Sequence, residues 1–422
     1  MAKKSRGNNE GSIRERKKGQ WEGRVTIGRK PDGRPNRISF YGTSRQEVSN
    51  KITDALSKLQ NGTFVEPNKV TISQWLDKWM EVYQKGTISP NFYARRKDLI
   101  RLHITPKIGK ILLLKLKPAD IKGFYNQLAK DGRKPRKKKN GDTISFKEGT
   151  SLGLATGTIR HIHNILNPAM RQAVREGLVP KNVVADVTPP KLVKTREANP
   201  LDKTEAGLYL AALKDNRLYA GFVVELTTGL RRGELIGLHW SDIQNGVLKI
   251  RRQVSRVKHD DGSSSLEYTD LKTPSSYRSI VLPTITIAEL KAHKARQAQE
   301  KLLAGKTYKD EGLIFCNTIG QKLDTRRFYS IHSDTLKKIG LKHRAFHDLR
   351  HSVASLLLQA GESIKTVQDI MGHADADTLM NVYAHLFEEM KQSAADKLDS
   401  IFAEPVPLEK TEGAVEEDIV VI

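Results

Sequence analysis

The amino-acid sequence predicts a mainly α-helical protein with small β-sheets, that is, an α+β fold, and three observations support this. Apolar residues recur three and four positions apart along several long segments, as they do on one face of a helix. Strand-like stretches are short and lie near residues 21–42 and 246–283. A proline- and charge-rich segment at 187–201 separates two such regions, which indicates a multidomain chain.

Residues 21–42 contain two strand patterns around a Pro-Asp-Gly turn, and a helix is predicted at 43–59. Ser44 and Glu47 have the spacing of a capping box at the start of that helix. We therefore expect a small three-stranded sheet with one helix. Residues 1–62 carry 15 basic against 6 acidic side chains, so we interpret the unit as DNA-binding rather than as an accessory domain.

The next region is predicted to be helical, with helices near 76–83, 92–104, 117–130 and 156–177. Arginines gather on the last helix opposite its apolar stripe. Residues 133–139 hold six basic side chains out of seven. Such a run is either a solvated loop or, beside DNA, a strap that binds phosphates. The candidate DNA-binding residues of this region are Arg95, Arg96, Lys137, Lys138, Arg160 and Arg171.

The second half of the chain begins with helices predicted near 204–214 and 217–228. Strand patterns follow at 246–257 and 278–283, and the chain is predicted to be mostly helical from about 284 onward. An acidic tail follows the last helical pattern and ends in a short apolar tip.

The composition points to a polyanionic partner. The net charge is +24 and the isoelectric point about 9.8, which favours nucleic acid over an anionic membrane because the basic residues are spread over several segments. The single cysteine, Cys316, excludes a disulfide framework and a cysteine-based zinc site and suits a reducing compartment. With neither a signal-peptide pattern nor an apolar run of membrane-spanning length, we expect a cytoplasmic protein.

The stretch FHDLRHS (346–352) raises the question of a metal. His347 and His351 are four apart, the spacing of the zinc-binding histidines in H-E-x-x-H proteases. Arg350 lies between them, and a guanidinium repels a cation but grips a phosphate with paired hydrogen bonds. On this evidence alone the stretch could bind either.

Other candidate residues are individually weak. Arg231 and Glu234 lie three apart at the start of a helix after a glycine, a place that suits an anion, although Arg-x-x-Glu on a helix is usually a surface ion pair. Lys272 precedes a Thr-Pro-Ser-Ser turn, His373 follows a helix-ending Met-Gly, and Tyr383 lies ten residues further on.

Taken in order, these elements resemble a known family. G-L-R-x-G-E-L, a K-T-x-S-S-x-R-x-I-x-L hairpin, H-D-L-R-H, M-G-H and Y-A-H together resemble the tyrosine recombinases, the phage-integrase family. The resemblance implies four parts, namely an arm-type DNA-binding domain (1–64), a helical core-binding, SAM-like domain (65–190) with a basic insertion at about 131–152, a catalytic domain (198–395) and an acidic tail (396–422).

The resemblance also implies the role of each site residue. Tyr383 would be the nucleophile that forms a 3′-phosphotyrosine bond. Arg231 and Arg350 would hold the non-bridging phosphate oxygens, and Lys272 would protonate the leaving 5′ oxygen. His347 and His373 would complete the phosphate pocket and assist proton transfer, and Glu234 would orient its neighbours.

The chemistry agrees with this assignment. Charge gathers on oxygens in a phosphodiester transition state, so fixed cationic donors are the main lever. We therefore expect that the reaction needs no cofactor, metal or ATP. Residues 346–352 are expected to bind phosphate rather than zinc, and His351 is expected to have a structural role.

Partners follow from the same resemblance. The first is double-stranded DNA that carries core and arm attachment sites, on which the chain would form a homotetramer. The resemblance also allows for an excisionase and a host DNA-bending protein. The expected function is integration and excision of a prophage or conjugative transposon at the bacterial nucleoid. A chromosome or plasmid resolvase and a non-catalytic DNA-binding regulator on the same fold are the alternatives.

Overall fold

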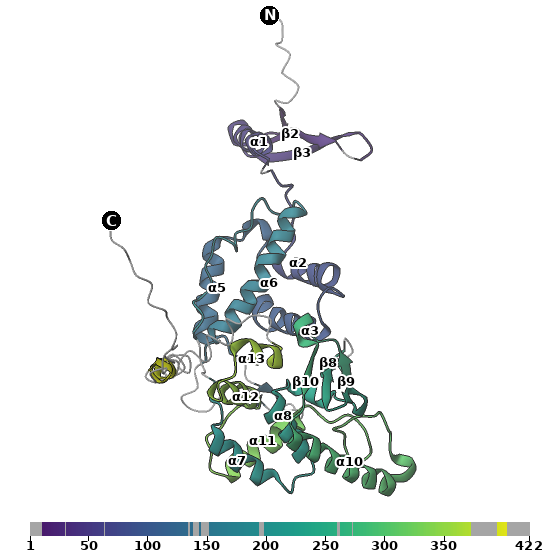
Figure 1. The fold of residues 1–422 in the computed structure, drawn as a ribbon. Helices are drawn as coiled ribbons and strands as arrows, with labels where there is room; N and C mark the ends of the chain where they lie inside the picture. The colour runs from purple at the N-terminus through teal and green to yellow at the C-terminus, as the bar shows by residue number, and fades with distance from the viewer. Residues whose placement is uncertain are drawn as a thin grey trace, which may run out of the picture. The chain divides into compact units, whose positions relative to one another are not determined.

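The computed structural model describes residues 11–29, 31–62, 64–133, 136–137, 143–144, 152–193, 198–259, 262–271, 273–372 and 395–402. The chain divides into two compact units, Met1–Lys194 and Thr195–Ile422, and each is described by itself (Figure 1). Helices dominate and the sheets are small, which confirms the predicted fold class. Among the described residues, none of the helices has the length and apolar character needed to cross a membrane.

The first unit begins with an antiparallel sheet of order β1-β2-β3, built from β1 (Ser12–Lys17), β2 (Gln20–Arg29) and β3 (Pro35–Gly42). Helix α1 (Arg45–Gln60) covers one face of it (Figure 1). Val48 and Ile52 of α1 approach the sheet so closely at Gly23 that an added Cβ would lie 2.5 Å from each. This face is the core of the small domain, and the other face carries polar side chains.

The start of α1 differs in detail from the predicted capping box. Ser44 accepts a hydrogen bond from the Glu47 backbone N–H at 3.1 Å, as expected. The Glu47 carboxylate accepts from the N–H of Thr43, one residue earlier than in the reciprocal box, at 2.8 Å. Both interactions still satisfy N–H groups at the helix start.

The rest of the first unit is helical around an apolar core. Its elements are α2 (Ile72–Trp79), the π-helical turn η1 (Met80–Gln84), α3 (Pro90–Leu99), the π-helical turn η2 (Ile100–Ile104), α4 (Thr105–Ile108), η3 (Leu113–Lys115), α5 (Pro118–Asp131) and α6 (Thr156–Arg175). Trp75 of α2 anchors the core by donating its indole N–H to the Ala169 carbonyl of α6 at 2.9 Å. In the basic insertion, β4 (Arg136–Lys137) pairs with β5 (Thr143–Ile144), a short hairpin that the sequence did not predict.

The second unit combines two small sheets with helices (Figure 1). Its elements are α7 (Lys203–Leu213), α8 (Tyr219–Thr228), α9 (Arg232–Ile236), η4 (Trp240–Asp242), β6 (Ile243–Gln244), β7 (Val247–Ile250), β8 (Gln253–Lys258), β9 (Ser264–Thr269), η5 (Pro274–Ser276), β10 (Arg278–Val281), α10 (Thr284–Ala304), η6 (Gly305–Thr307), α11 (Arg326–Lys338), α12 (His347–Gln359) and α13 (Ile364–Met371). Residues 395–402 are also helical.

The strand predicted at 246–257 is two strands in two sheets. β7 lies between β10 and β6, whereas β8 forms a separate hairpin with β9. Arg251 and Arg252 stand between them, and Arg252 turns to the buried Asp242 with an Nη1 to Oδ2 distance of 2.7 Å. That ion pair holds the chain at the point where it leaves one sheet for the other.

Candidate active site

Arg350 connects the ends of two helices inside the second unit. It lies on α12, is only 2% exposed, and donates to the carbonyls of Gly229 and Met371. Gly229 ends α8 with a φ of 59°, a conformation that glycine adopts without strain. A Cβ at Gly229 would lie 2.4 Å from the Met371 methyl carbon, so this position requires a glycine for both reasons. The guanidinium is thereby held in a fixed place.

Arg231 lies beside Arg350, since the two donate to consecutive carbonyls at the end of α13. Nη2 of Arg231 reaches the Gly372 carbonyl at 3.1 Å, and Nη1 reaches Glu234 Oε1 at 2.7 Å and Ser276 Oγ at 3.3 Å. Its side chain remains 30% exposed. Arg231 therefore combines a fixed position with an edge open to a ligand.

A third arginine, Arg278 of β10, belongs to the same cluster and was missed as a site residue. Its side chain is 6% exposed and donates to the carbonyl of Ile370 at 2.7 Å and to Glu234 Oε2 at 3.1 Å. Glu234, 1% exposed, is thus held between Arg231 and Arg278. The arginine of the K-T-x-S-S-x-R pattern was the available signal, but nothing in the sequence distinguished it from a surface residue.

The cluster shifts the protonation of its own members. Burial raises the pKa of Glu234, but the Arg278 charge and the hydrogen bonds from Arg231 outweigh it, so the pKa lies below its ordinary value. Burial, and then the charges of Arg231 and Arg278, lower the pKa of Arg350 to about 9. Arg350 therefore remains protonated at pH 7, and the site keeps its cationic donors.

Glu225 of α8 is a second buried acid in this region. It is 1% exposed, and its Oε2 has no hydrogen-bond partner among the described residues. Burial raises its pKa well above the ordinary value, although the charge of Arg350 acts in the opposite direction. Burial thus disfavours the charged form of the Glu225 carboxyl, whereas Glu234 is held in its charged form by Arg231 and Arg278.

His347 and His351 lie on α12 with ring centroids 5.1 Å apart and nearly perpendicular planes. His347 is exposed by surface area, yet desolvation by the surrounding protein, followed by the charges of His351, Arg350 and Arg231, lowers its pKa to about 4. Within the described ranges, no group of three or more His, Cys, Asp or Glu side chains could hold a metal ion. The arginines beside this pair favour an anion over a cation.

Lys272, His373 and Tyr383 lie outside the described residues. Two chain neighbours of these residues belong to the cluster. Thr273, which follows Lys272, has its hydroxyl 3.0 Å from the Ser276 hydroxyl, and Ser276 accepts from Arg231. Gly372, which precedes His373, accepts from Arg231.

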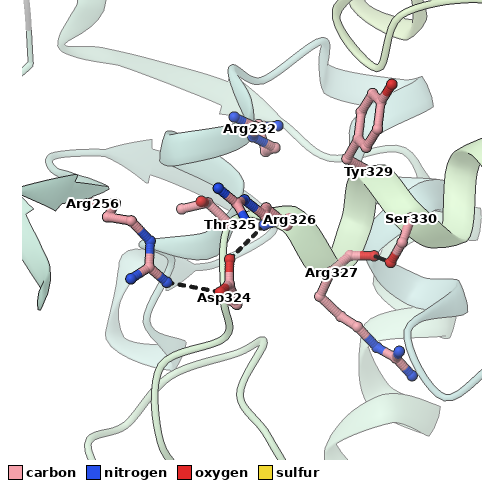
Figure 2. Close-up of a pocket in the computed structure, with 8 residues that line it drawn as sticks. All are labelled: Arg232, Arg256, Asp324, Thr325, Arg326, Arg327, Tyr329 and Ser330. Atoms are coloured by element: carbon pink, nitrogen blue, oxygen red, sulfur yellow. Dashed lines mark hydrogen bonds and ion pairs between the residues drawn. The ribbon is translucent and has the colours of Figure 1, made fainter. Parts of the chain in front are cut away.

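A second basic feature of the same unit is a pocket of about 780 Å³ (Figure 2). It is lined by Arg232, Arg256, Asp324, Thr325, Arg326, Arg327, Tyr329 and Ser330. The lining holds four arginines and one carboxylate, Asp324, which pairs with Arg256 at 2.7 Å. The net charge of the lining is therefore positive. Figure 2 shows that the guanidinium of Arg327 points away from the other arginines. Arg232 follows Arg231 directly, which joins the pocket to the cluster through α9.

The predicted DNA-binding residues of the first unit differ in their surroundings. Arg160 and Arg171 are exposed on α6, and Arg95 is exposed on α3. Arg96 lies over the rings of Phe92 and Trp79 and donates to Gln84, and its contact with DNA stays a prediction. The side chain of Lys137, and all of Lys138, lie outside the described residues.

Comparisons with known proteins agree with this architecture. The model of the Phage integrase family matches residues 201–390, and that of the phage integrase N-terminal SAM-like domain matches 71–129, together more than half of the chain. A tyrosine recombinase XerC-like protein of Caldanaerobacter subterraneus subsp. tengcongensis is 28% identical over 394 residues, which cover 90% of this chain and 95% of that protein.

Two solved structures share the fold. The Tn1549 transposon integrase in complex with transposon right end DNA has a TM-score of 0.60 at 21% identity, covering 78% of this chain and 99% of that one. A lambda integrase tetramer bound to a Holliday junction has a TM-score of 0.51 at 20% identity, covering 86% of this chain and 96% of that one.

Proposed function

The chain belongs to the phage integrase family of tyrosine recombinases, enzymes that break and rejoin DNA, and from this premise we propose that it integrates and excises a mobile element at specific DNA sites. The observation that carries the proposal is the meeting of Arg231 and Arg350 at two consecutive carbonyls, Met371 and Gly372. Residues 119 positions apart in the sequence form one cationic site there.

In the proposed reaction the Tyr383 oxygen attacks the phosphorus of a DNA phosphodiester, while its phenol proton passes to a histidine of the phosphate pocket, His347 or His373. A 3′-phosphotyrosine bond forms, the bond to the 5′ oxygen breaks, and Lys272 supplies the proton to that leaving oxygen. Rejoining is the reverse, since a 5′-hydroxyl attacks and the tyrosine leaves. The covalent intermediate conserves the energy of the bond, so neither ATP nor a metal ion is part of the proposal.

The arginines would hold the two non-bridging oxygens through this sequence. Donors that are already fixed cost no reorganisation when charge develops. The bonds of Arg350 to Gly229 and Met371, and those of Arg231 to Glu234 and Gly372, supply that fixation. We assign His347 and His373 to the phosphate pocket, where an incoming phosphate would raise the pKa of His347 from about 4.

The remaining basic features would hold the duplex. The pocket containing Arg232 and Arg326 would receive backbone phosphates of the core site, and Arg160 and Arg171 on α6 would grip the same duplex. The sheet domain at 11–62 would bind a separate arm site. Recombination of two duplexes needs four active sites, so the working form would be a homotetramer on DNA, with an excisionase and a host DNA-bending protein as further partners at the nucleoid.

Covalent trapping tests the chemistry. On a nicked suicide substrate carrying the attachment core, wild-type protein should form an SDS-resistant complex with the DNA 3′ end, also in excess EDTA. Tyr383→Phe should bind the same DNA with similar affinity and form no covalent complex. A linked Phe variant would show that another residue is the nucleophile, and loss of cleavage on chelation, restored by zinc or magnesium, would show a metal requirement.

Deletion of residues 1–63 separates an integrase from a resolvase. If the sheet domain binds arm sites, the deletion should spare cleavage of a short core-only substrate and abolish or greatly reduce integration between full attachment sites. Full recombination by the truncated protein would favour the resolvase alternative. A folded variant that no longer cleaves the core would place residues 1–63 in the core clamp.

A further inference from the structure

The uncovered face of the N-terminal sheet is organised around one carboxylate. Strand register places Glu22 opposite Arg14 of β1 and Tyr41 of β3, on the face that α1 does not cover. Glu22 is nevertheless 1% exposed, because the side chains around it lie over it and not because it is in the core. A shielded acid is unexpected on a face meant for DNA, since it repels phosphate.

The contacts of Glu22 explain its presence. Its Oε2 accepts from Arg14 Nε at 3.0 Å and Nη2 at 2.8 Å, and its Oε1 accepts from Arg24 Nε at 3.0 Å. Arg16 Nε lies 3.7 Å from Oε2. The hydrogen bonds from Arg14 and then Arg24 outweigh the opposing effect of desolvation and lower the pKa of Glu22 to about 2. The carboxylate is therefore charged throughout the physiological pH range.

The arginines keep their outer edges open while they are held. Their side chains are 58%, 57% and 46% exposed at Arg14, Arg16 and Arg24. Arg24 uses only its Nε–H on Glu22, and within the described part of the chain neither of its terminal nitrogens donates to an acceptor. Two parallel N–H groups match the O6 and N7 acceptors of guanine in the major groove. A fixed guanidinium loses less side-chain entropy on binding than a free one.

We propose that Glu22 is a positioning residue, which presents Arg24 and Arg14 as guanine readers on the arm-binding sheet. This rests on the proposed arm-binding function and adds to it the chemical class of the recognised bases. A three-stranded sheet with exposed arginines can enter the major groove, where β-ribbons read base edges. Glu22 itself touches no DNA and acts through the arginines.

Positioning of the arginines by Glu22 and simple electrostatics predict opposite effects of Glu22→Gln on the affinity for arm DNA. Glu22→Gln removes a negative charge from a DNA-facing surface, so charge alone would tighten all binding. If Glu22 positions the arginines, affinity for the arm sequence should instead fall about tenfold, as for the loss of one bidentate base contact, while affinity for unrelated duplex stays the same or rises.

The experiment uses the full chain and a pool of duplexes with a randomised central segment. Wild-type protein should enrich two sequence classes, one for core and one guanine-containing class for arm binding, and N7-methylation of those guanines should block the second. Glu22→Gln should lose the arm class and keep the core class as an internal control. Asp54→Asn, which removes an exposed carboxylate of α1 paired with Lys58, should keep both.

Arg24→Lys guards against misfolding of the Glu22 variant, because it keeps the charge and removes only the guanidinium fork. It should lose the arm class as well, with an unchanged salt dependence and an unchanged melting temperature. An arm class that survives Glu22→Gln or Arg24→Lys at the wild-type ratio of specific to non-specific affinity overturns the positioning role. If wild-type protein enriches the core class alone, arm binding itself fails, and the inference fails with it.

Discussion

Arg278→Met is the substitution that most directly tests the arginine cluster. Arg278 and Glu234 have side chains 6% and 1% exposed, so their ion pair is desolvated, unlike the surface pairs of this protein. Removal of one partner leaves a buried charge poorly compensated, which typically costs about 3–5 kcal/mol. For a domain of this size each kcal/mol lowers the melting temperature by about 2–4 °C, so we expect a fall of about 6–20 °C.

The matched control is Lys365→Met on α13, in the same unit. Lys365 pairs with Asp369 at 2.9 Å, and both side chains are largely exposed, at 74% and 63%. Such a pair contributes about 0.3–0.5 kcal/mol, so this variant should melt within about 2 °C of wild-type protein. Thermal unfolding followed by circular dichroism measures both changes under the same conditions.

A double-mutant cycle identifies the cause. Glu234→Gln removes the partner charge, so Arg278→Met should cost distinctly less in that background than alone. The covalent-trapping assay should show slower cleavage by Arg278→Met, because Glu234 also holds Arg231. A single substitution that costs less than about 1 kcal/mol, or a cycle that is additive, would refute the view that this pair holds the site together.

Three further outcomes are expected. Gly229→Ala should destabilise the protein by about 2–4 kcal/mol, because the alanine would strain the left-handed backbone and its Cβ would overlap with Met371. Adding Met371→Ala should relieve the overlap but not the backbone strain, and urea unfolding of the single and double variants measures both. Because the pKa of His347 is about 4 against an ordinary 6.5, the unfolded chain binds more protons there between these pH values, so stability falls as pH falls, and His347→Gln should lose less stability over that range than wild type. Changing the basic residues of 133–139 to Gln should flatten the dependence of DNA affinity on salt without altering sequence preference, and an unchanged slope would make the run a solvated loop.

The sequence by itself determined the features that depend on local pattern and on charge. The 3.6-residue period located most helices, and the glycine that ends α8 was readable because few other residues adopt its backbone conformation. The ordered motifs containing Arg231 and Arg350 identified the family, because a motif consists of residue types and spacings that can be read directly from the sequence. The excess of basic side chains indicated a polyanionic partner without any knowledge of the fold.

Only the tertiary structure decided which charged residues act together. Arg278 and Glu234 are 44 positions apart, and Arg231 and Gly372 are 141 apart, so their contacts depend on how β10, α9 and α13 pack. Arg95 and Arg96 look alike in sequence, yet one is exposed and the other lies over Phe92. Glu22 reads as one more surface acid until strand register places it among three arginines. Residue type gives each group its charge, but burial and the identity of its neighbours determine what that charge does, and both arise only when distant segments of the chain meet.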